Sequence, residues 1–194
     1  MTGPSTASSA ATSGPQSAAA PGTEPEPAAE KLLRLLQEGD ARHRLIEHEP
    51  EGRTDVVSAI RGNSLGQAAK CIVVRVKKTK KTSHYVLAVV PGDTRLDLDR
   101  IAELCEARYV SFADQPAAER LTGCATGTIV PFAFDPRLEL VVDPGLLRHP
   151  EIFFNAAELH QSLALDTEDY VRLAAPRVES IAEAAPAAPA ASGD

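Results

Sequence analysis

Residues 68–93 read AAKCIVVRVKKTKKTSHYVLAVVPGD, in which two apolar runs flank a short basic stretch. The runs at 68–76 and 85–90 are rich in β-branched residues, which favour extended strands. The polar stretch 77–83 between them has the length of a hairpin connection, and Pro91-Gly92-Asp93 is a turn signal after the second run. The sequence therefore predicts two central strands paired as a hairpin.

Helical and strand-like patterns alternate around this hairpin. The expected helices cover 29–38, 54–60, 96–106, 116–121 and 166–173, and the further expected strands cover 42–49, 138–142, 152–155 and 162–165. We expect Gly39 to end the first helix in a left-handed conformation. Thr54 or Asp55 is the expected N-cap of the second helix. Asp166 or Thr167 is the expected N-cap of the last one.

Short strands interleaved with helices are typical of an α+β domain. We expect a mixed, mostly antiparallel sheet with surrounding helices rather than a doubly wound parallel sheet. The two ends of the chain lack the large apolar side chains that would offset the entropy lost on ordering. The sequence thus predicts a disordered Ala/Pro/Ser-rich arm at 1–27, a single folded domain at 28–182 and a disordered tail at 183–194.

Composition excludes several classes of protein. The formal net charge is −7, and four of these charges lie in residues 1–27 and 177–194, so the core is only mildly acidic. Such a balance does not suit non-specific coating of nucleic acid, which requires a local excess of Lys and Arg, so any nucleic-acid contact must use a patch. The chain has neither a secretory signal nor an apolar run long enough to span a membrane. We therefore expect a soluble cytoplasmic protein without membrane or DNA partners.

The cysteines and histidines form no recognisable catalytic or metal-binding motif. Cys71, Cys105 and Cys124 are widely spaced without a C-x-x-C pair, and the five histidines show no H-x-x-x-H or H-E-x-x-H spacing. We expect no metal and no other cofactor. Cys124 could act as a nucleophile, but a small buried cysteine is the favoured interpretation. No serine lies in a G-x-S-x-G pattern.

Two segments are candidates for binding a ligand. Lys70 stands directly before the first apolar strand, where its ammonium group could bind a phosphate or carbonyl oxygen at a pocket mouth. Position alone favours an ordinary solvent-exposed lysine. The stretch 122–132 contains Gly123 and Gly127 and a closing Pro131, so its backbone could approach a ligand and offer N–H groups. Taken alone, this stretch is better explained as a tight structural turn, because it matches neither a P-loop nor G-x-G-x-x-G.

A basic cluster lies on the predicted hairpin, close to His84 and Tyr85. Its members are Arg75, Lys77, Lys78, Lys80 and Lys81. They could follow the phosphate backbone of a nucleic acid. They could also form a solvated hairpin that discourages pairing with other strands. The sequence does not favour either interpretation.

The order and spacing of several short segments carry a resemblance to a known family. These segments are 48–50, 66–70, 86–93, 121–123, 127–132, Asp143, 154–156 and 165–170. Over about residues 32–175 the chain resembles the YbaK-like deacylases, which also occur as editing domains fused to or standing beside prolyl-tRNA synthetases. The resemblance implies an α+β fold with a small pocket for the aminoacyl end of tRNA.

The resemblance also implies roles for individual residues. In such proteins the lysine matching Lys70 orients the tRNA 3′ end, and the loop from Gly127 to Pro131 holds the scissile ester with backbone groups. Water and the terminal ribose hydroxyl of the substrate would complete the hydrolysis without a metal or covalent intermediate. The expected substrate-binding residues are His48, Thr128, Ile129, Val130, Asn155, Ala156 and Ala157. The basic hairpin would contact tRNA.

The chain departs from this family at one point, because many relatives read Asn-Ala-Gly where it reads Asn155-Ala156-Ala157. We therefore leave open which small amino acid is removed: Ala, Ser, Thr or a non-protein analogue. The expected function is a free-standing trans-editing hydrolase acting on mischarged aminoacyl-tRNA. The alternative is a non-catalytic module of the same fold that binds tRNA or an aminoacyl-tRNA synthetase.

Overall fold

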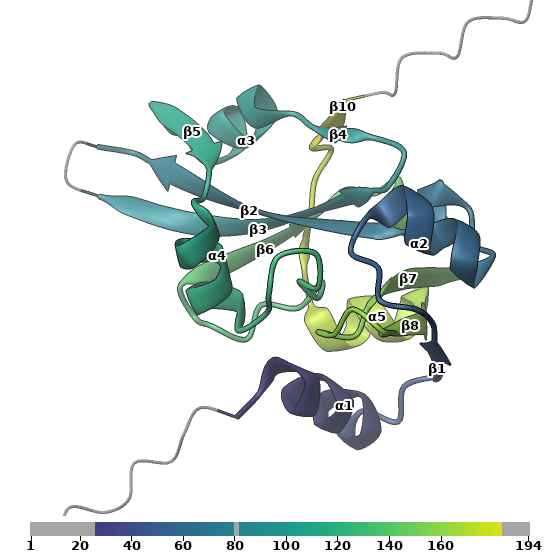
Figure 1. Cartoon of the computed structure of the whole chain (residues 1–194). Coiled ribbons are helices and arrows are strands. Elements are labelled where there is room, and N and C mark those ends of the chain that lie inside the picture. Colours follow the sequence, from purple (N-terminus) through teal and green to yellow (C-terminus); the bar gives the residue numbers. More distant parts are fainter. Residues whose placement is uncertain (1–25, 80–81, 184–194) are drawn as a thin grey trace, which may run out of the picture.

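The computed structural model describes residues 26–79 and 82–183. Its main sheet has the strand order β5-β2-β3-β6-β9 (Figure 1). The strands are β2 (Ala69–Lys77), β3 (Ser83–Pro91), β5 (Tyr109–Phe112), β6 (Leu138–Val142) and β9 (Arg177–Val178). The predicted hairpin is confirmed: β2 and β3 are antiparallel, and Lys70 lies opposite Val90. β3 pairs with β6, and β6 with β9, in parallel.

Two smaller antiparallel sheets complete the β-structure of the described residues. One has the order β1-β8-β7, and the other pairs β10 with β4. Their strands are β1 (His43–Glu47), β7 (Glu151–Asn155), β8 (Gln161–Asp166), β4 (Arg95–Leu96) and β10 (Ala182–Glu183). The mixed, mostly antiparallel α+β fold is therefore confirmed, although its strands are divided among three sheets.

Five α-helices lie in the described part of the chain, each close to its expected position. They are α1 (Ala28–Glu38), α2 (Thr54–Arg61), α3 (Leu98–Leu104), α4 (Gln115–Thr122) and α5 (Thr167–Ala174). Asp166 caps α5 as expected, accepting hydrogen bonds from the next turn. The predicted left-handed conformation of Gly39 after α1 and the predicted N-cap of α2 were wrong. Gly39 has a φ of −84°, and the following Asp40 takes the left-handed conformation instead. The N-cap of α2 is Arg53, without a side-chain cap.

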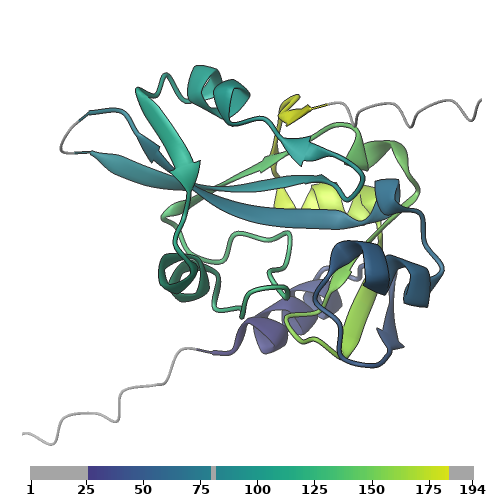
Figure 2. The same cartoon turned by 45° about the horizontal axis from the view of Figure 1, so that its top comes forward.

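The main sheet separates two apolar clusters, because alternate residues of β3 point to opposite faces. Leu87 and Val89 belong to the larger cluster with Leu32 and Leu36 of α1. The intervening β3 residues face a smaller cluster that includes Ile181, which is fully buried. α3 covers this second face, while α1 and α4 lie on the other side of the sheet (Figures 1 and 2).

The segment that follows α5 returns across the second face of the sheet. Its position is fixed by Asp143, which follows β6. Asp143 Oδ2 accepts hydrogen bonds from the amides of Ile181 and Ala182, both at 2.9 Å. The other oxygen accepts the Gly145 amide at 2.8 Å. The carboxylate therefore joins the end of the folded region to the main sheet.

The expected arm and tail lie almost wholly outside the described residues, so their disorder and the limits 28–182 remain predictions. Lys80 and Lys81 of the basic hairpin also lie outside them. No helix within 26–79 or 82–183 has the length and apolar character needed to cross a membrane.

Candidate functional site

A cavity of about 200 Å³ lies where α2, the start of β2, β7 and the 126–129 loop meet. Its lining residues are Gly52, Thr54, Val57, Arg61, Ala68, Ala69, Lys70, Cys71, Thr126, Gly127, Ile129, Phe153, Phe154 and Asn155. Four of the residues expected in the site are among them: Lys70, Gly127, Ile129 and Asn155. Other hollows of about 300–400 Å³ on the described surface contain none of the expected catalytic or substrate-binding residues.

Gly127 requires the absence of a side chain for two reasons. Its φ is +90°, a backbone conformation that residues with a side chain rarely adopt. A Cβ atom would also lie 3.2 Å from Gly52 Cα, so the two glycines pack backbone against backbone. The 126–129 loop is therefore held against the segment before α2 across one side of the cavity.

Asn155 fixes this contact through its side-chain amide. Nδ2 donates to the carbonyl oxygen of Gly127 at 3.1 Å and to that of Glu51 at 2.8 Å. Oδ1 accepts a hydrogen bond from Ser162 Oγ at 3.0 Å. The side chain is buried and its hydrogen-bonding groups are occupied within the protein. Its geometry is that of a residue that positions the loop.

Two backbone amides of the loop have no hydrogen-bond acceptor in the described part of the chain. Within the described chain, the N–H groups of Gly127 and Ile129 donate to no protein acceptor, and both residues line the cavity. Their neighbours are engaged, because Thr126 N donates to Glu119 and Thr128 N donates to Ala125 O. Fixed, unpaired N–H groups can stabilise a developing oxyanion.

Lys70 borders the cavity, with its ammonium group held at the neighbouring turn. Nζ donates to the carbonyl oxygens of Thr94 and, at 3.4 Å, Gly92. Burial lowers the pKa of Lys70, the negative charge of Asp93 opposes this shift, and Arg95 adds to it. The lysine is thus half-buried and directed by backbone carbonyls, not free in solvent.

Arg61 is a lining residue that the sequence analysis missed. It hydrogen-bonds only neutral partners in the described structure: Asn63 Oδ1 at 3.1 Å, Ser162 Oγ at 3.2 Å and Ser58 Oγ at 3.4 Å. Burial lowers its pKa to about 10, and it pairs with no acidic side chain of the described regions. An arginine at the end of an amphipathic helix gives no signal in sequence that it will be half-buried against a cavity. It leaves a positive charge in the cavity wall that could bind an anion.

His48 does not line the cavity but lies behind it. Its Nε2 is 2.6 Å from Ser162 Oγ, and Nδ1 is 2.8 Å from Glu49 O. Ser162 also contacts Arg61 and Asn155, so its hydroxyl joins three side chains behind the cavity wall. His48 is therefore connected to the cavity through this serine.

The remaining expected substrate-binding residues, and Pro131, which was expected to be catalytic, also lie outside the cavity lining. Thr128, Val130 and Ala156 are buried. Pro131 accepts a hydrogen bond from Tyr170 at 2.9 Å through its carbonyl oxygen, which ties the loop to α5. Ala157 has a positive φ of 65° in the turn between β7 and β8. These residues shape the surroundings of the cavity.

The structure also shows the surroundings of Cys124 and of the described residues of the basic hairpin. Cys124 is buried, as expected, and burial raises the pKa of its thiol, which opposes a nucleophilic role. Arg75 and Lys78 are exposed and, within the described chain, make no ion pair. Lys77 Nζ lies 5.8 Å from the centre of the Tyr109 ring, a cation–π distance.

Comparison with known proteins agrees with this architecture. The sequence profile of the family described as the aminoacyl-tRNA editing domain matches residues 48–173. The Multifunctional Ser/Thr-tRNA deacylase ProXp-y of Escherichia coli strain K12 is 41% identical over 150 residues, which cover 77% of this chain and 89% of that protein. Its counterpart from Escherichia coli O157:H7 matches equally well.

Solved structures share the fold. The crystal structure of a hypothetical protein has a TM-score of 0.71 at 23% identity, covering 79% of this chain and 99% of that one. A candidate trans-editing enzyme for prolyl tRNA synthetase has a TM-score of 0.68 at 22% identity, covering 82% and 99%. The fold, the extent of the profile match and the 41% identity lead to one conclusion. The chain belongs to the aminoacyl-tRNA editing domain family.

Proposed function

We propose that the protein is an aminoacyl-tRNA deacylase that hydrolyses the ester of mischarged tRNA, with the aminoacyl group in the cavity. The observation that carries this proposal is that two residues lining the cavity, Gly127 and Ile129, have backbone amides without a protein acceptor among the described residues. Ester hydrolysis develops negative charge on the carbonyl oxygen, and two fixed donors stabilise that charge without reorganising. Asn155 and the Gly52–Gly127 contact hold the donors in place.

The remaining chemistry requires positioning rather than a covalent intermediate. A water molecule beside the ester, assisted by the neighbouring ribose hydroxyl of the terminal nucleotide, would attack the carbonyl carbon. Alignment of such groups can supply a large part of the rate enhancement. The raised pKa values of Cys71, in the lining, and Cys124, nearby, support this choice, because both thiols are held in the protonated form.

Cations at the cavity would orient the tRNA end. We assign this role to Lys70, whose ammonium group could exchange its carbonyl partners for a phosphate or ribose oxygen. Arg61 would bind the phosphate nearest the terminal nucleotide, because its charge has no acidic partner among the described residues. Arg75 lies five residues after Lys70 on β2, and the usual rise of a strand places it about 17 Å from that lysine. The basic hairpin could therefore contact more distant phosphates of the same tRNA.

The cavity favours a small, hydroxyl-bearing amino acid. Its volume of about 200 Å³ is below the roughly 300–1,000 Å³ of drug-sized ligand sites. Thr54 lines it, and the Thr54 hydroxyl makes no hydrogen bond in the described structure, so it can pair with a substrate hydroxyl. The name of the E. coli relative refers to Ser/Thr-tRNA. We infer that Ser-tRNA and Thr-tRNA are substrates here also.

The test is a deacylation assay with tRNAs carrying Ser, Thr, Ala and a larger apolar amino acid. We expect turnover of the first two, near-complete loss of turnover in Lys70→Ala, and unchanged turnover in the control Lys31→Ala on α1. Thr54→Val keeps the side-chain shape and should reduce Ser-tRNA deacylation about tenfold relative to Ala-tRNA, the worth of one hydrogen bond. Full activity of Lys70→Ala would remove that residue from the mechanism.

The alternative function is a non-catalytic module that recruits tRNA or a synthetase through the basic hairpin. The two available amides in the cavity favour the enzyme, because binding alone does not require them. Tight binding of every tRNA in the panel without deacylation would establish the alternative.

A further inference from the structure

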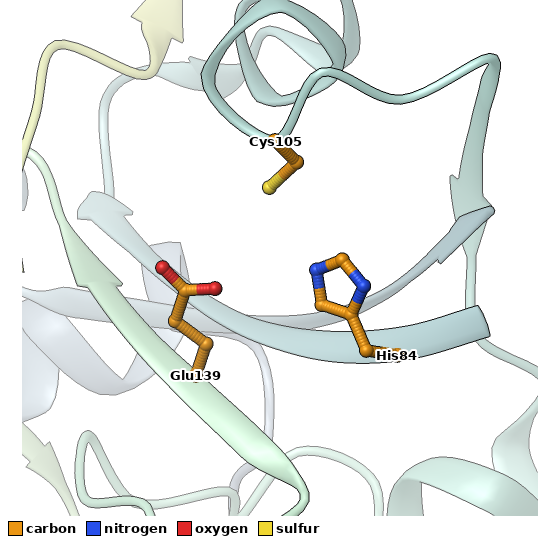
Figure 3. A group of neighbouring side chains, drawn as sticks. All are labelled: His84, Cys105 and Glu139. Atoms are coloured by element: carbon orange, nitrogen blue, oxygen red, sulfur yellow. The ribbon is translucent and has the colours of Figure 1, made fainter. Parts of the chain in front are cut away.

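A second group of side chains meets on the α3 side of the main sheet, away from the cavity. His84 of β3, Cys105 at the C-terminus of α3 and Glu139 of β6 place a ring nitrogen, a sulfur and a carboxylate oxygen within 4.8 Å of one another. Figure 3 shows Cys105 extending from the end of α3 toward the space between His84 and Glu139. The three residues come from segments more than twenty positions apart, which is why their spacing in sequence shows no metal motif.

The sheet brings two of these residues together. β3 and β6 are parallel neighbours in which Tyr85 lies opposite Leu138 and Val86 opposite Glu139. His84 and Glu139 therefore lie close together on adjacent strands. Cys105 completes the group because the Ile101 turn of α3 packs into the smaller apolar cluster on this face.

The donor atoms of this group are available. Within the described residues the His84 ring makes no hydrogen bond, and neither does the Cys105 sulfur. Glu139 Oε1 is held by Arg177 Nη1 at 3.3 Å, which orients the carboxylate and leaves Oε2 without a protein partner. His84 and Glu139 are half-buried and Cys105 is buried.

We propose that His84, Cys105 and Glu139 form a zinc-binding site. Imidazole nitrogen, thiolate sulfur and carboxylate oxygen are the three ligand types that Zn²⁺ takes in proteins, and water would occupy the fourth tetrahedral position. As the sulfur–zinc bond forms, the Cys105 thiol releases its proton to solvent. The ligand atoms now lie within 4.8 Å of one another and would draw together by about 1 Å around the ion.

The proposed site lies apart from the cavity, on the other face of the main sheet. His84 lies on the same face of β3 as Val86, whereas the cavity borders the opposite, larger cluster. A zinc ion here would join α3 to β3 and β6 without reaching the ester. Binding to the folded state alone would raise the stability of the protein, since the unfolded chain does not bring the three ligands together.

Calorimetric titration of the untagged full chain with Zn²⁺ tests the site. We expect one ion per chain, and a loss of affinity of at least about tenfold in His84→Ala, in Glu139→Gln and in Cys105→Ser. His160→Ala is the matched control, because His160 is exposed beside Glu158 and could bind zinc adventitiously. Binding that survives the three substitutions, or that His160→Ala abolishes, would overturn the proposal.

Cobalt substitution identifies the sulfur ligand. Co²⁺ added to the wild-type chain should give a thiolate-to-metal charge-transfer band that persists in Cys71→Ala and Cys124→Ala and is absent from Cys105→Ser. The circular dichroism of each variant shows whether it is folded, and Glu139→Gln, which alters no buried residue, covers the case in which Cys105→Ser does not fold. Absence of the band from the folded wild-type chain would exclude the site.

Discussion

Replacing Asn155 tests how the 126–129 loop is held. Asn155→Ala removes three hydrogen bonds, two donated to Glu51 O and Gly127 O and one accepted from Ser162. At about 1 kcal/mol net for each, the free energy of unfolding should fall by about 3 kcal/mol. Folded domains are stable by about 5–15 kcal/mol, so the variant should remain folded at 25 °C.

The same substitution should reduce catalysis. Once Gly127 O is released, the amides of Gly127 and Ile129 are no longer fixed, and we expect the single-turnover deacylation rate to fall by about a hundredfold to a thousandfold, the effect typical of losing one oxyanion donor. Urea denaturation followed by circular dichroism gives the stability, and rapid-quench deacylation gives the rate.

Two further variants test whether the lost hydrogen bonds of Asn155, rather than the change of side chain in general, reduce stability and turnover. Asn155→Asp keeps the shape of the side chain but places a carboxylate oxygen against two carbonyl oxygens, so it should lose at least as much stability as Asn155→Ala. Gln161→Ala removes a neighbouring side-chain amide that makes no hydrogen bond in the described structure, and it should change neither property. Wild-type stability of Asn155→Asp, or wild-type turnover of Asn155→Ala, would refute this account of the loop.

Three other substitutions have expected outcomes. Gly127→Ala should cost about 1–3 kcal/mol of stability in urea denaturation and most of the activity, because of the positive φ and the approach to Gly52; an active, fully stable variant would contradict this. Ala157→Gly should raise the free energy of unfolding by about 0.5–1 kcal/mol, since a left-handed alanine is strained; a lower urea midpoint would be the opposite result. Hydrogen bonds from Arg172 and Arg42 lower the pKa of Asp169 from 3.8, so its stabilising effect is complete above that pH and is lost as the pH falls through the folded value. Asp169→Asn should therefore be less stable than wild type at pH 7 by an amount that shrinks below pH 3.8; a difference that stays constant with pH would exclude the ion pairs as its cause.

The long strands and helices were predictable because their own side chains determine them. The β-branched run of β2 and the leucines of α1 form apolar faces that have few alternatives. β4, β9 and β10 have two residues each, and β5 has four, so pairing with neighbours determines them. No pattern in the sequence could have placed them.

The candidate site was predictable only in part. Lys70 and Gly127 were identified by the order of segments shared with a family, whereas their local sequences favoured an exposed lysine and a structural turn. Arg61 and Thr54 were not predicted as site residues, because only the packing of α2 against β2 and β7 places them beside the cavity. The roles of His48 and Asn155 depend on Ser162, more than one hundred residues after His48. Long-range contacts of this kind leave no local signal.

The two ends of the folded region have a consequence for how short this protein can be made. The family profile spans 48–173, yet Leu32 and Leu36 enter the larger cluster from α1, and Ile181 enters the smaller one from beyond α5. Each such side chain contributes about 1.5–3 kcal/mol when buried. We expect a chain cut to the profile limits to expose both clusters and aggregate, and a chain of residues 26–183 to stay monodisperse. The enzyme would then tolerate fusion partners at its two ends more readily than the removal of those ends.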